Sequence, residues 1–351
     1  MKRSLLLILI LIAAGFCKLF AQTFDNKIYG IVKDIATGKP LTDVNIFISH
    51  FTWGTTSDQN GNFNLSSIRP GKHELVFSII GYATQSKSVT VTKDSVLFSE
   101  IKLIPKVYEL KEVTVVEEKP DEWYDDLDKF IEKFFGYTRN PHNCIVVNQN
   151  YLEFNHPEEN ILVARCEYPL EILNYSLGYR IMCEIQEFEY DSWSAELKQN
   201  YRLYYSELDT SDTAVKNEWI KNRRLSYQKS LYFFFKKLIS DSYTKENFSI
   251  TLVTKPRIIR QTRLIEINSS TEILTKNKIT ETYQLSFSNY LQVEYDDYYR
   301  NPKISWLKLN YPFITIDKYG YPLEDYAITL LGYCAKSGIA SSLPKDYDIP
   351  E

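Results

Sequence analysis

Residues 54–82 read GTTSDQNGNFNLSSIRPGKHELVFSIIGY, and the turns and strands of this stretch set the architecture of the N-terminal third of the chain. Apolar residues recur at every second position around its turns; they are Val44, Ile46 and Ile48 before the stretch and Leu75, Phe77 and Ile79 within it. A period of two is the pattern of a β-strand. Asn60-Gly61 predicts a tight hairpin, because both residue types tolerate positive φ. Arg69-Pro70-Gly71 predicts a second reversal, since Pro presets φ and Gly accepts the left-handed conformation.

Residues 27–103 contain only short strand patterns separated by turn signals, without helical periodicity. This arrangement is typical of an antiparallel β-sandwich of about seven strands. We therefore predict a mainly β chain in which residues 22–104 form an Ig-like or transthyretin-like sandwich.

Three segments of this third resemble the carboxypeptidase regulatory-like domain, a transthyretin-like module. The segments are GIVKDIATGKPLTDVNIFI (residues 30–48), GTTSDQNGNFNL (54–65) and RPGKHELVFSIIGY (69–82). The module occurs beside some metallocarboxypeptidases and at the N-terminus of many TonB-dependent outer-membrane receptors of Gram-negative bacteria, and it is itself non-catalytic. The resemblance implies a scaffold or docking module rather than a peptidase.

The first 21 residues have the pattern of a signal peptide. Lys2 and Arg3 precede an apolar run over residues 5–12, which is too short to span a bilayer. We expect cleavage after Ala21; lipoprotein processing at Cys17 is disfavoured because the bulky Phe16 precedes it. The mature chain has no later run of membrane-spanning length, so we predict an exported protein of the periplasm, the outer membrane or the cell surface.

Composition excludes some partners. The chain has 41 basic and 45 acidic residues and a formal net charge of −4, which argues against nucleic acid and anionic lipid as partners. It contains 27 Tyr and only 2 Met, as expected for an exported β-protein. Exposed tyrosines could also bind glycans, so envelope proteins and glycans remain the expected partners.

Four cysteines follow the predicted signal peptide; they are Cys144, Cys166, Cys183 and Cys334. An even number of cysteines in an oxidising compartment permits disulfides. Each of the four lies in an apolar or strand-like context, where a free thiol behaves as a small hydrophobe. Both states remain open from the sequence.

Residues 105–120, PKVYELKEVTVVEEKP, read as a linker in which residues 113–116 could add one strand. Beyond it, residues 121–136 predict a helix capped by Asp121 and ended by Gly136. A longer helical pattern covers residues 212–239. Strand patterns fill much of the remainder; they cover residues 144–154, 161–166, 179–190, 197–207, 250–254, 263–267, 283–287, 292–295, 303–309, 313–317 and 326–333. We predict that residues 121–351 form an α+β domain, an antiparallel sheet with a few helices on one face.

This half also resembles the companion domain that follows the regulatory-like module in a group of exported proteins. The segments are PLEILNYSLGYRI (residues 169–181), RRLSYQKSLYFFFKKL (223–238) and residues 319–350. Relatives tend to carry Gly and His where this chain has Lys229 and Phe233. The departure weakens any expectation of a catalytic histidine on this helix, and the resemblance implies no reaction.

The module's name raises the question of a zinc carboxypeptidase. His156 and Glu159 have H-x-x-E spacing, but zinc catalysis needs a third protein ligand. The histidines are His50, His73, His142 and His156, and none follows His156 in the sequence. We therefore interpret residues 156–159 as a turn.

Other candidate sites have equally plain structural interpretations. His142 and Cys144 would share one strand face, but no third member of a triad is indicated. Asp58, Asn60 and Asn62 match only the start of a calcium loop and are better explained by a turn. The pairs Asp125-Asp126 and Asp296-Asp297 are expected on solvated faces.

These observations predict no catalytic, cofactor-binding or metal-binding residue, and no cofactor. We expect a non-catalytic exported envelope protein whose β-sandwich docks or presents a C-terminal domain that binds protein or glycan. The alternative is a hydrolase with an unrecognised site in residues 121–351.

Overall fold

The computed structural model describes residues 26–106, 119–136, 143–256, 265–295 and 303–348. The chain divides into two compact units, residues 1–116 and 117–351. The predicted signal peptide and the predicted extra strand at 113–116 lie outside the described residues. Over the described ranges, no helix has both the length and the apolarity needed to cross a membrane.

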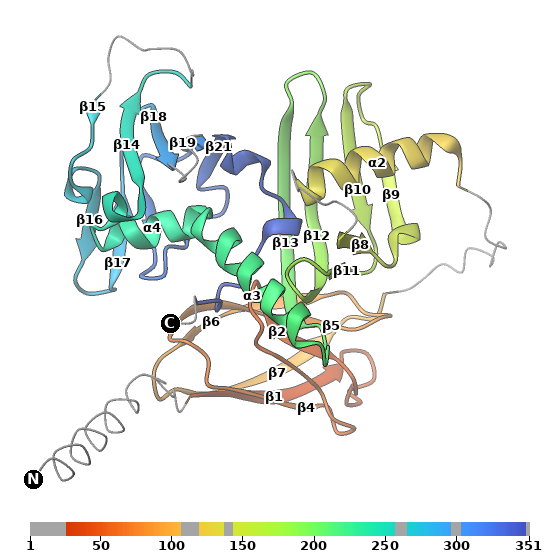
Figure 1. Cartoon of the computed structure of the whole chain (residues 1–351). Helices are drawn as coiled ribbons and strands as arrows, with labels where there is room; N and C mark the ends of the chain where they lie inside the picture. The colour runs from red at the N-terminus through yellow and green to blue at the C-terminus, as the bar shows by residue number, and fades with distance from the viewer. Residues whose placement is uncertain (1–25, 107–118, 137–142, 257–264, 296–302, 349–351) are drawn as a thin grey trace, which may run out of the picture. The chain divides into compact units, whose positions relative to one another are not determined.

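Over residues 26–106, the N-terminal unit forms seven strands in two sheets. The strands are β1 (Lys27–Asp34), β2 (Asn45–Ile48), β3 (Gly54–Thr56), β4 (Asn62–Ser66), β5 (Gly71–Ser78), β6 (Gln85–Val91) and β7 (Val96–Leu103). One sheet has the order β4-β1-β7 and the other β3-β2-β5-β6 (Figure 1). Alternate residues of both sheets form a single core, which includes Val32, Ile46, Leu75 and Leu103.

Two details of this unit differ from the sequence prediction. β1 pairs with β7 in parallel, so the strands are not all antiparallel. Asn60-Gly61 does not close a hairpin, because β3 and β4 belong to different sheets. Gly61 has a φ of 75°, and its amide donates to the Asp58 carbonyl at 2.9 Å. The dipeptide therefore carries the chain from one sheet to the other.

The C-terminal unit begins with helix α2 (Asp121–Phe135) and a six-stranded antiparallel sheet. The sheet contains β8 (Cys144–Val146), β9 (Leu152–Asn155), β10 (Ile161–Cys166), β11 (Leu170–Asn174), β12 (Tyr179–Asp191) and β13 (Glu196–Glu207), with a 3-10 turn, η2 (Gln149–Tyr151), before β9. Figure 1 shows α2 lying across these strands, and its residues Leu127, Phe130 and Phe134 belong to the core on that face of the sheet.

The second half of this unit holds helices α3 (Thr213–Gln228) and α4 (Leu231–Ile239). A five-stranded sheet of order β15-β14-β18-β19-β21 and a three-stranded sheet of order β16-β17-β20 complete it. The strands are β14 (Phe248–Val253), β15 (Ile265–Glu266), β16 (Leu274–Asn277), β17 (Thr282–Leu285), β18 (Tyr290–Tyr295), β19 (Lys303–Leu309), β20 (Ile314–Ile316) and β21 (Ile328–Gly332). The 3-10 turns are η3 (Tyr243–Glu246), η4 (Ser270–Glu272), η5 (Cys334–Lys336) and η6 (Ile339–Ser341). Phe234, Phe235 and Leu238 of α4 pack with both sheets in a second core.

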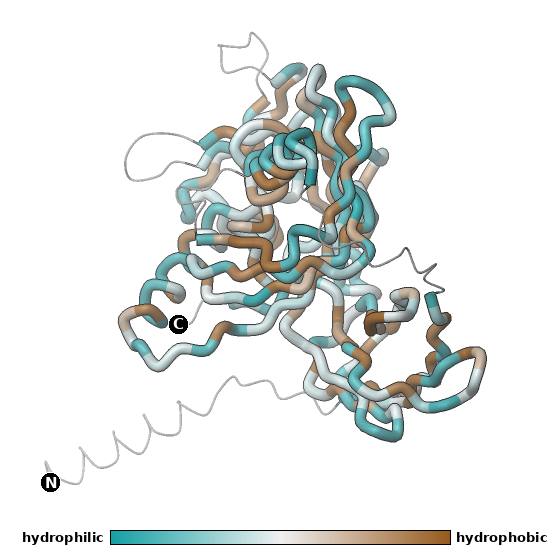
Figure 2. The backbone as a smooth tube through the Cα atoms, turned by 90° about the vertical axis from the view of Figure 1, so that its right-hand side faces the viewer, coloured by the Kyte–Doolittle hydropathy of each residue, from teal (hydrophilic) through white to brown (hydrophobic). Residues whose placement is uncertain are grey.

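The mainly β prediction is confirmed, as are an N-terminal β region and a C-terminal α+β region of antiparallel sheets. In Figure 2, hydrophobic and hydrophilic residues alternate along much of the tube, as strands with one buried face require.

Five details of the C-terminal prediction differ from the structure. The unit contains three sheets and two cores rather than one sheet. The pattern at 212–239 is two helices, the pattern at 144–154 is two strands separated by η2, and strands β11 and β16 were not predicted. Pro120, not Asp121, occupies the N-cap position of α2.

Candidate functional site

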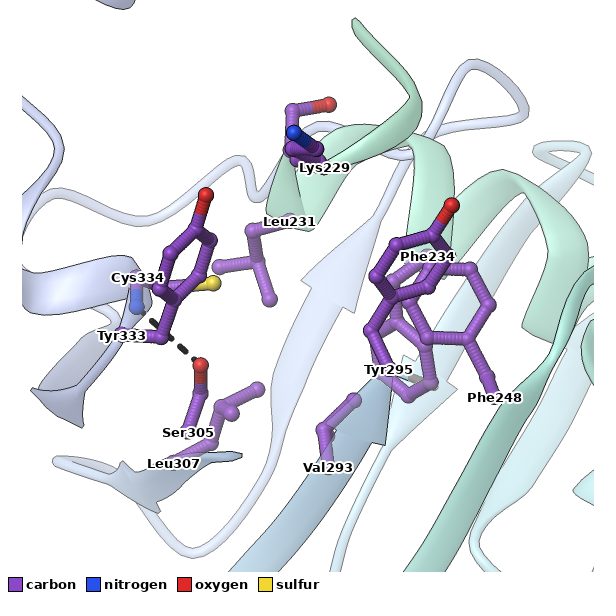
Figure 3. Close-up of a pocket in the computed structure, with 11 residues that line it drawn as sticks. Lys229, Leu231, Phe234, Phe248, Val293, Tyr295, Ser305, Leu307, Tyr333 and Cys334 are labelled. Atoms are coloured by element: carbon purple, nitrogen blue, oxygen red, sulfur yellow. Dashed lines mark hydrogen bonds between the residues drawn. The ribbon is translucent and has the colours of Figure 1, made fainter. Parts of the chain in front are cut away.

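A pocket in the C-terminal unit lies between the start of α4, strands β14, β18 and β19, and the start of η5. Its cavity volume is about 20 Å³, room for about one water molecule and far below the range of about 300–1,000 Å³ for small-molecule sites. Its lining residues are Lys229, Ser230, Leu231, Phe234, Phe248, Val293, Tyr295, Ser305, Leu307, Tyr333 and Cys334. Figure 3 shows Tyr333 and Cys334 on one wall, with Phe234, Tyr295 and Phe248 on the other.

The break between α3 and α4 creates the rim of this pocket. Ser230 is the N-cap of α4, and its Oγ accepts a hydrogen bond from the Phe233 amide at 3.1 Å. Because α4 starts anew here, Leu231 and Phe234 turn toward the pocket while Lys229 stays at the edge (Figure 3). We did not predict this site; the one signal for it in the sequence is a serine, a good N-cap residue, inside a long helical pattern.

The lining of the pocket is mainly apolar and aromatic. The Phe248 ring lies 5.4 Å from the Phe234 ring and 5.1 Å from the Tyr295 ring, measured between centroids. The Cys334 amide donates to the Ser305 Oγ at 3.1 Å. Burial raises the pKa of the Cys334 thiol, which keeps it protonated at neutral pH. A protonated thiol is a poor nucleophile, since the thiolate is the reactive form.

The residues of the zinc and thiol hypotheses lie elsewhere. His156 places its Nε2 2.8 Å from the Asp126 Oδ2 of α2, and Glu159 is exposed. Cys144 is buried in the core under α2, where burial raises the pKa of its thiol to about 12. His142, like Asp296 and Asp297, lies outside the described residues.

The pairing with His156 corrects one expectation. Asp126 is buried, 7% exposed, rather than on a solvated face. Its partner in the sequence, Asp125, is exposed as predicted. Since helix neighbours point in different directions, α2 turns one carboxylate of the pair toward His156 and the other toward solvent.

All four described cysteines are free thiols. Cys144 and Cys183 are buried, and Cys166 and Cys334 are partly buried. Burial raises the thiol pKa of Cys166 and Cys183 as well. Of the two states that the sequence left open, the structure has the buried-thiol state.

The acidic turn of the N-terminal unit uses its carboxylate internally. The Asp58 Oδ1 accepts hydrogen bonds from the backbone amides of Asn60 and Asn62, at 2.9 and 2.8 Å. These hydrogen bonds lower the pKa of the Asp58 carboxyl, and the bond from Asn62 has the largest effect. Asp58 thus fixes the turn that joins the two sheets.

A second carboxylate of this unit joins two of the segments singled out in the sequence. The Asp34 Oδ1 accepts from the Thr37 amide at 2.6 Å, and its Oδ2 accepts from the Tyr82 hydroxyl at 2.8 Å. Both hydrogen bonds lower the pKa of the Asp34 carboxyl, and the bond from Thr37 has the larger effect. Residues 30–48 and 69–82 are therefore tied together by a structural contact.

In the C-terminal unit, α3 binds the backbone of the β11–β12 turn. The Trp219 indole donates to the Tyr175 carbonyl at 2.8 Å, and the Asn222 amide donates to the Ser176 carbonyl at 3.0 Å. Arg223 donates to the next two carbonyls, those of residues 177 and 178, at 2.6 and 3.1 Å. We call this set of contacts the carbonyl ladder.

Arg223 completes the carbonyl ladder. It is 8% exposed, its guanidinium lies 4.0 Å from the centroid of the Tyr179 ring, and its Nη1 lies 2.5 Å from a Glu207 carboxylate oxygen. The segments at residues 169–181 and 223–238 thus meet in a packing contact.

Comparison with known proteins identifies the N-terminal unit. A family model for the CarboxypepD_reg-like domain matches residues 28–115. Residues 28–115 are a CarboxypepD_reg-like domain. A curated relative, the TonB-dependent receptor SusC of Bacteroides thetaiotaomicron, is 34% identical over 100 residues. That alignment covers 28% of this chain and 10% of SusC, so the chain spans about a tenth of the length of this relative.

Solved structures share much less with the CarboxypepD_reg-like domain and its companion. A type II cohesin–X-dockerin complex of Acetivibrio cellulolyticus is 20% identical, with 32% of this chain and 76% of that chain covered and a TM-score of 0.21. A Bacteroides uniformis protein provisionally described as carbohydrate-binding is 10% identical, with 84% and 99% covered and a TM-score of 0.20. These scores are too low to establish a shared fold.

Proposed function

We propose that this chain is a non-catalytic, exported protein of the Gram-negative cell envelope. Its CarboxypepD_reg-like domain serves as a docking module, and its C-terminal unit makes contacts with protein or glycan. The observation that carries the proposal is the match of residues 28–115, together with the 34% identity to SusC over 100 residues. In SusC the matching segment makes up 10% of a TonB-dependent receptor, which favours a docking role for the domain here.

The geometry of the candidate residues supports the non-catalytic part of the proposal. Asp34, Asp58 and Arg223 are held in turns and in the carbonyl ladder by hydrogen bonds within the chain. Cys144 and Cys334 have thiol pKa values raised by burial, which disfavours a thiolate nucleophile. The polar groups of these residues are therefore engaged in structural hydrogen bonds or shielded by burial, which favours a structural role for them.

The proposal is tested by incubating the purified full chain with panels of peptide, ester and glycan substrates, with and without zinc. We expect no turnover above the level of a reaction without the protein. Robust turnover that a single substitution such as His156→Ala or Cys334→Ser abolishes would establish the hydrolase alternative instead. Retained far-ultraviolet circular dichroism of each variant shows that the loss is not unfolding.

A further inference from the structure

One surface of the CarboxypepD_reg-like domain presents apolar side chains where strand alternation predicts polar ones. It is the outer face of the β4-β1-β7 sheet, whose three strands lie side by side in Figure 1. The inner face contributes Ile28 and Val32 to the core, whereas Tyr29, between them in sequence, points outward. Asn64 of β4 lies opposite Tyr29 and follows the expected polar pattern.

Three large side chains form a contiguous strip on this outer face. Phe98 is 57% exposed, Val96 63% and Tyr29 38%. The parallel register places Phe98 beside Tyr29, and Val96 precedes it by two residues on the same side of β7. Packing of the two rings across the strands stabilises the sheet, which accounts for the Tyr29–Phe98 pair. It does not account for Val96, and contiguous exposed apolar surface marks interaction sites.

Lysines flank this strip along the two strands, with Lys27 beside Val96 and Lys33 beside Lys102 beyond Phe98. Lys33 and Lys102 share the single carboxylate of Glu100, at 3.5 and 4.0 Å. The Lys27 ammonium lies 5.2 Å from the centroid of the Tyr29 ring. Three lysines thus accompany one glutamate, although the whole chain has a formal charge of −4. A partner with carboxylates around an apolar centre would complement this face in charge.

The ring geometry favours a protein over a sugar. The Tyr29 and Phe98 rings have centroids 5.4 Å apart and an interplanar angle of 59°, so they do not offer one flat platform for a pyranose ring. Tilted aromatic rings instead accept interdigitating side chains, and an aromatic centre with a charged rim is the usual anatomy of a protein interface. We propose that the outer face of the β4-β1-β7 sheet docks a partner protein whose contact surface is apolar at its centre and acidic at its edges.

This inference rests on the proposed docking function of the domain and names the chemistry of the partner. It is tested with a library of random displayed peptides selected on the immobilised full chain and counter-selected on the Phe98→Thr variant. Threonine keeps the charge and the strand propensity of the site. The matched control is Ile80→Thr, because Ile80 is 77% exposed in the same domain but lies outside the three strands of this sheet.

We expect enriched peptides that combine apolar and acidic residues. Their Kd should rise by about tenfold with Phe98→Thr and by less than about twofold with Ile80→Thr, and added salt should weaken binding. Equal binding to both variants, a basic consensus, or no enrichment would overturn the inference. So would binding of a polysaccharide panel that Phe98→Thr abolishes. Since the peptides report on the first domain alone, their failure is distinguishable from turnover in the substrate panel, which tests the proposed function.

Discussion

Gly178 shows how one residue determines a contact between two elements. It has a φ of 68°, and a Cβ on it would lie 2.2 Å from the Trp219 ring. Gly38 has almost the same φ, 69°, but a Cβ there would meet nothing within 4 Å. Substituting alanine at Gly38 therefore adds backbone strain alone, whereas substituting it at Gly178 adds the same strain and a steric clash.

We predict that Gly38→Ala lowers the free energy of unfolding by about 1–2 kcal/mol, the cost of a left-handed alanine. Gly178→Ala should cost at least about 3 kcal/mol, because Trp219 must also move and lose its bond to the Tyr175 carbonyl. Urea denaturation of the full chain, followed by circular dichroism, measures both losses. Equal losses for the two variants would contradict the clash seen in the structure.

The carboxylate of Asp191 makes the stability of the fold depend on pH. Its carboxylate accepts hydrogen bonds from the Asn160 side chain at 2.7 Å and from Ser194, and these bonds lower its pKa to about 2. Because the folded pKa lies below the ordinary value of 3.8, the ionised form stabilises the fold above about pH 4. That contribution is lost as the pH falls through about 2.

We therefore expect Asp191→Asn to lower Tm by a constant amount near neutral pH. The Tm difference from the unmodified chain should shrink between about pH 4 and pH 2. Differential scanning calorimetry across this range measures it, with Asp209→Asn, a change at an exposed aspartate, as the control. A Tm difference independent of pH would show that the charge of Asp191 is not what stabilises the turn.

At the scale of elements, the sequence predicted local periodicity well and long-range partners poorly. The helix at 121–135 was predictable because its apolar stripe is continuous and Gly136 ends it. The stripe at 212–239 is equally continuous, yet the chain breaks at Ser230, because Arg223 binds the β11–β12 turn while Phe234 faces the pocket. The local sequence pattern predicts neither the β11–β12 turn nor the pocket as a neighbour of this segment. Asn60-Gly61 likewise indicated a turn but not which sheets it joins.

The Ser230 cap can be tested directly. Ser230→Ala removes the oxygen that accepts from the Phe233 amide, so we expect a loss of about 1 kcal/mol in the free energy of unfolding. Ser230→Thr keeps a hydroxyl and should recover most of that loss. Urea denaturation of the full chain compares the three proteins. A gain in stability with alanine would mean that α3 and α4 prefer to continue as one helix.

At the scale of the whole molecule, each unit has its own hydrophobic interior. Among the residues that the structure describes, the core of the N-terminal unit draws on residues 28–103, and the two cores of the C-terminal unit draw on residues beyond 120. A domain with its own core can unfold by itself.

We expect calorimetry of the full chain to resolve separate transitions for the two units. Gly38→Ala should lower the Tm of the N-terminal transition alone, and Gly178→Ala should lower the Tm of the C-terminal transition alone. A single transition, or one that both substitutions shift equally, would show that the two units unfold as one cooperative body.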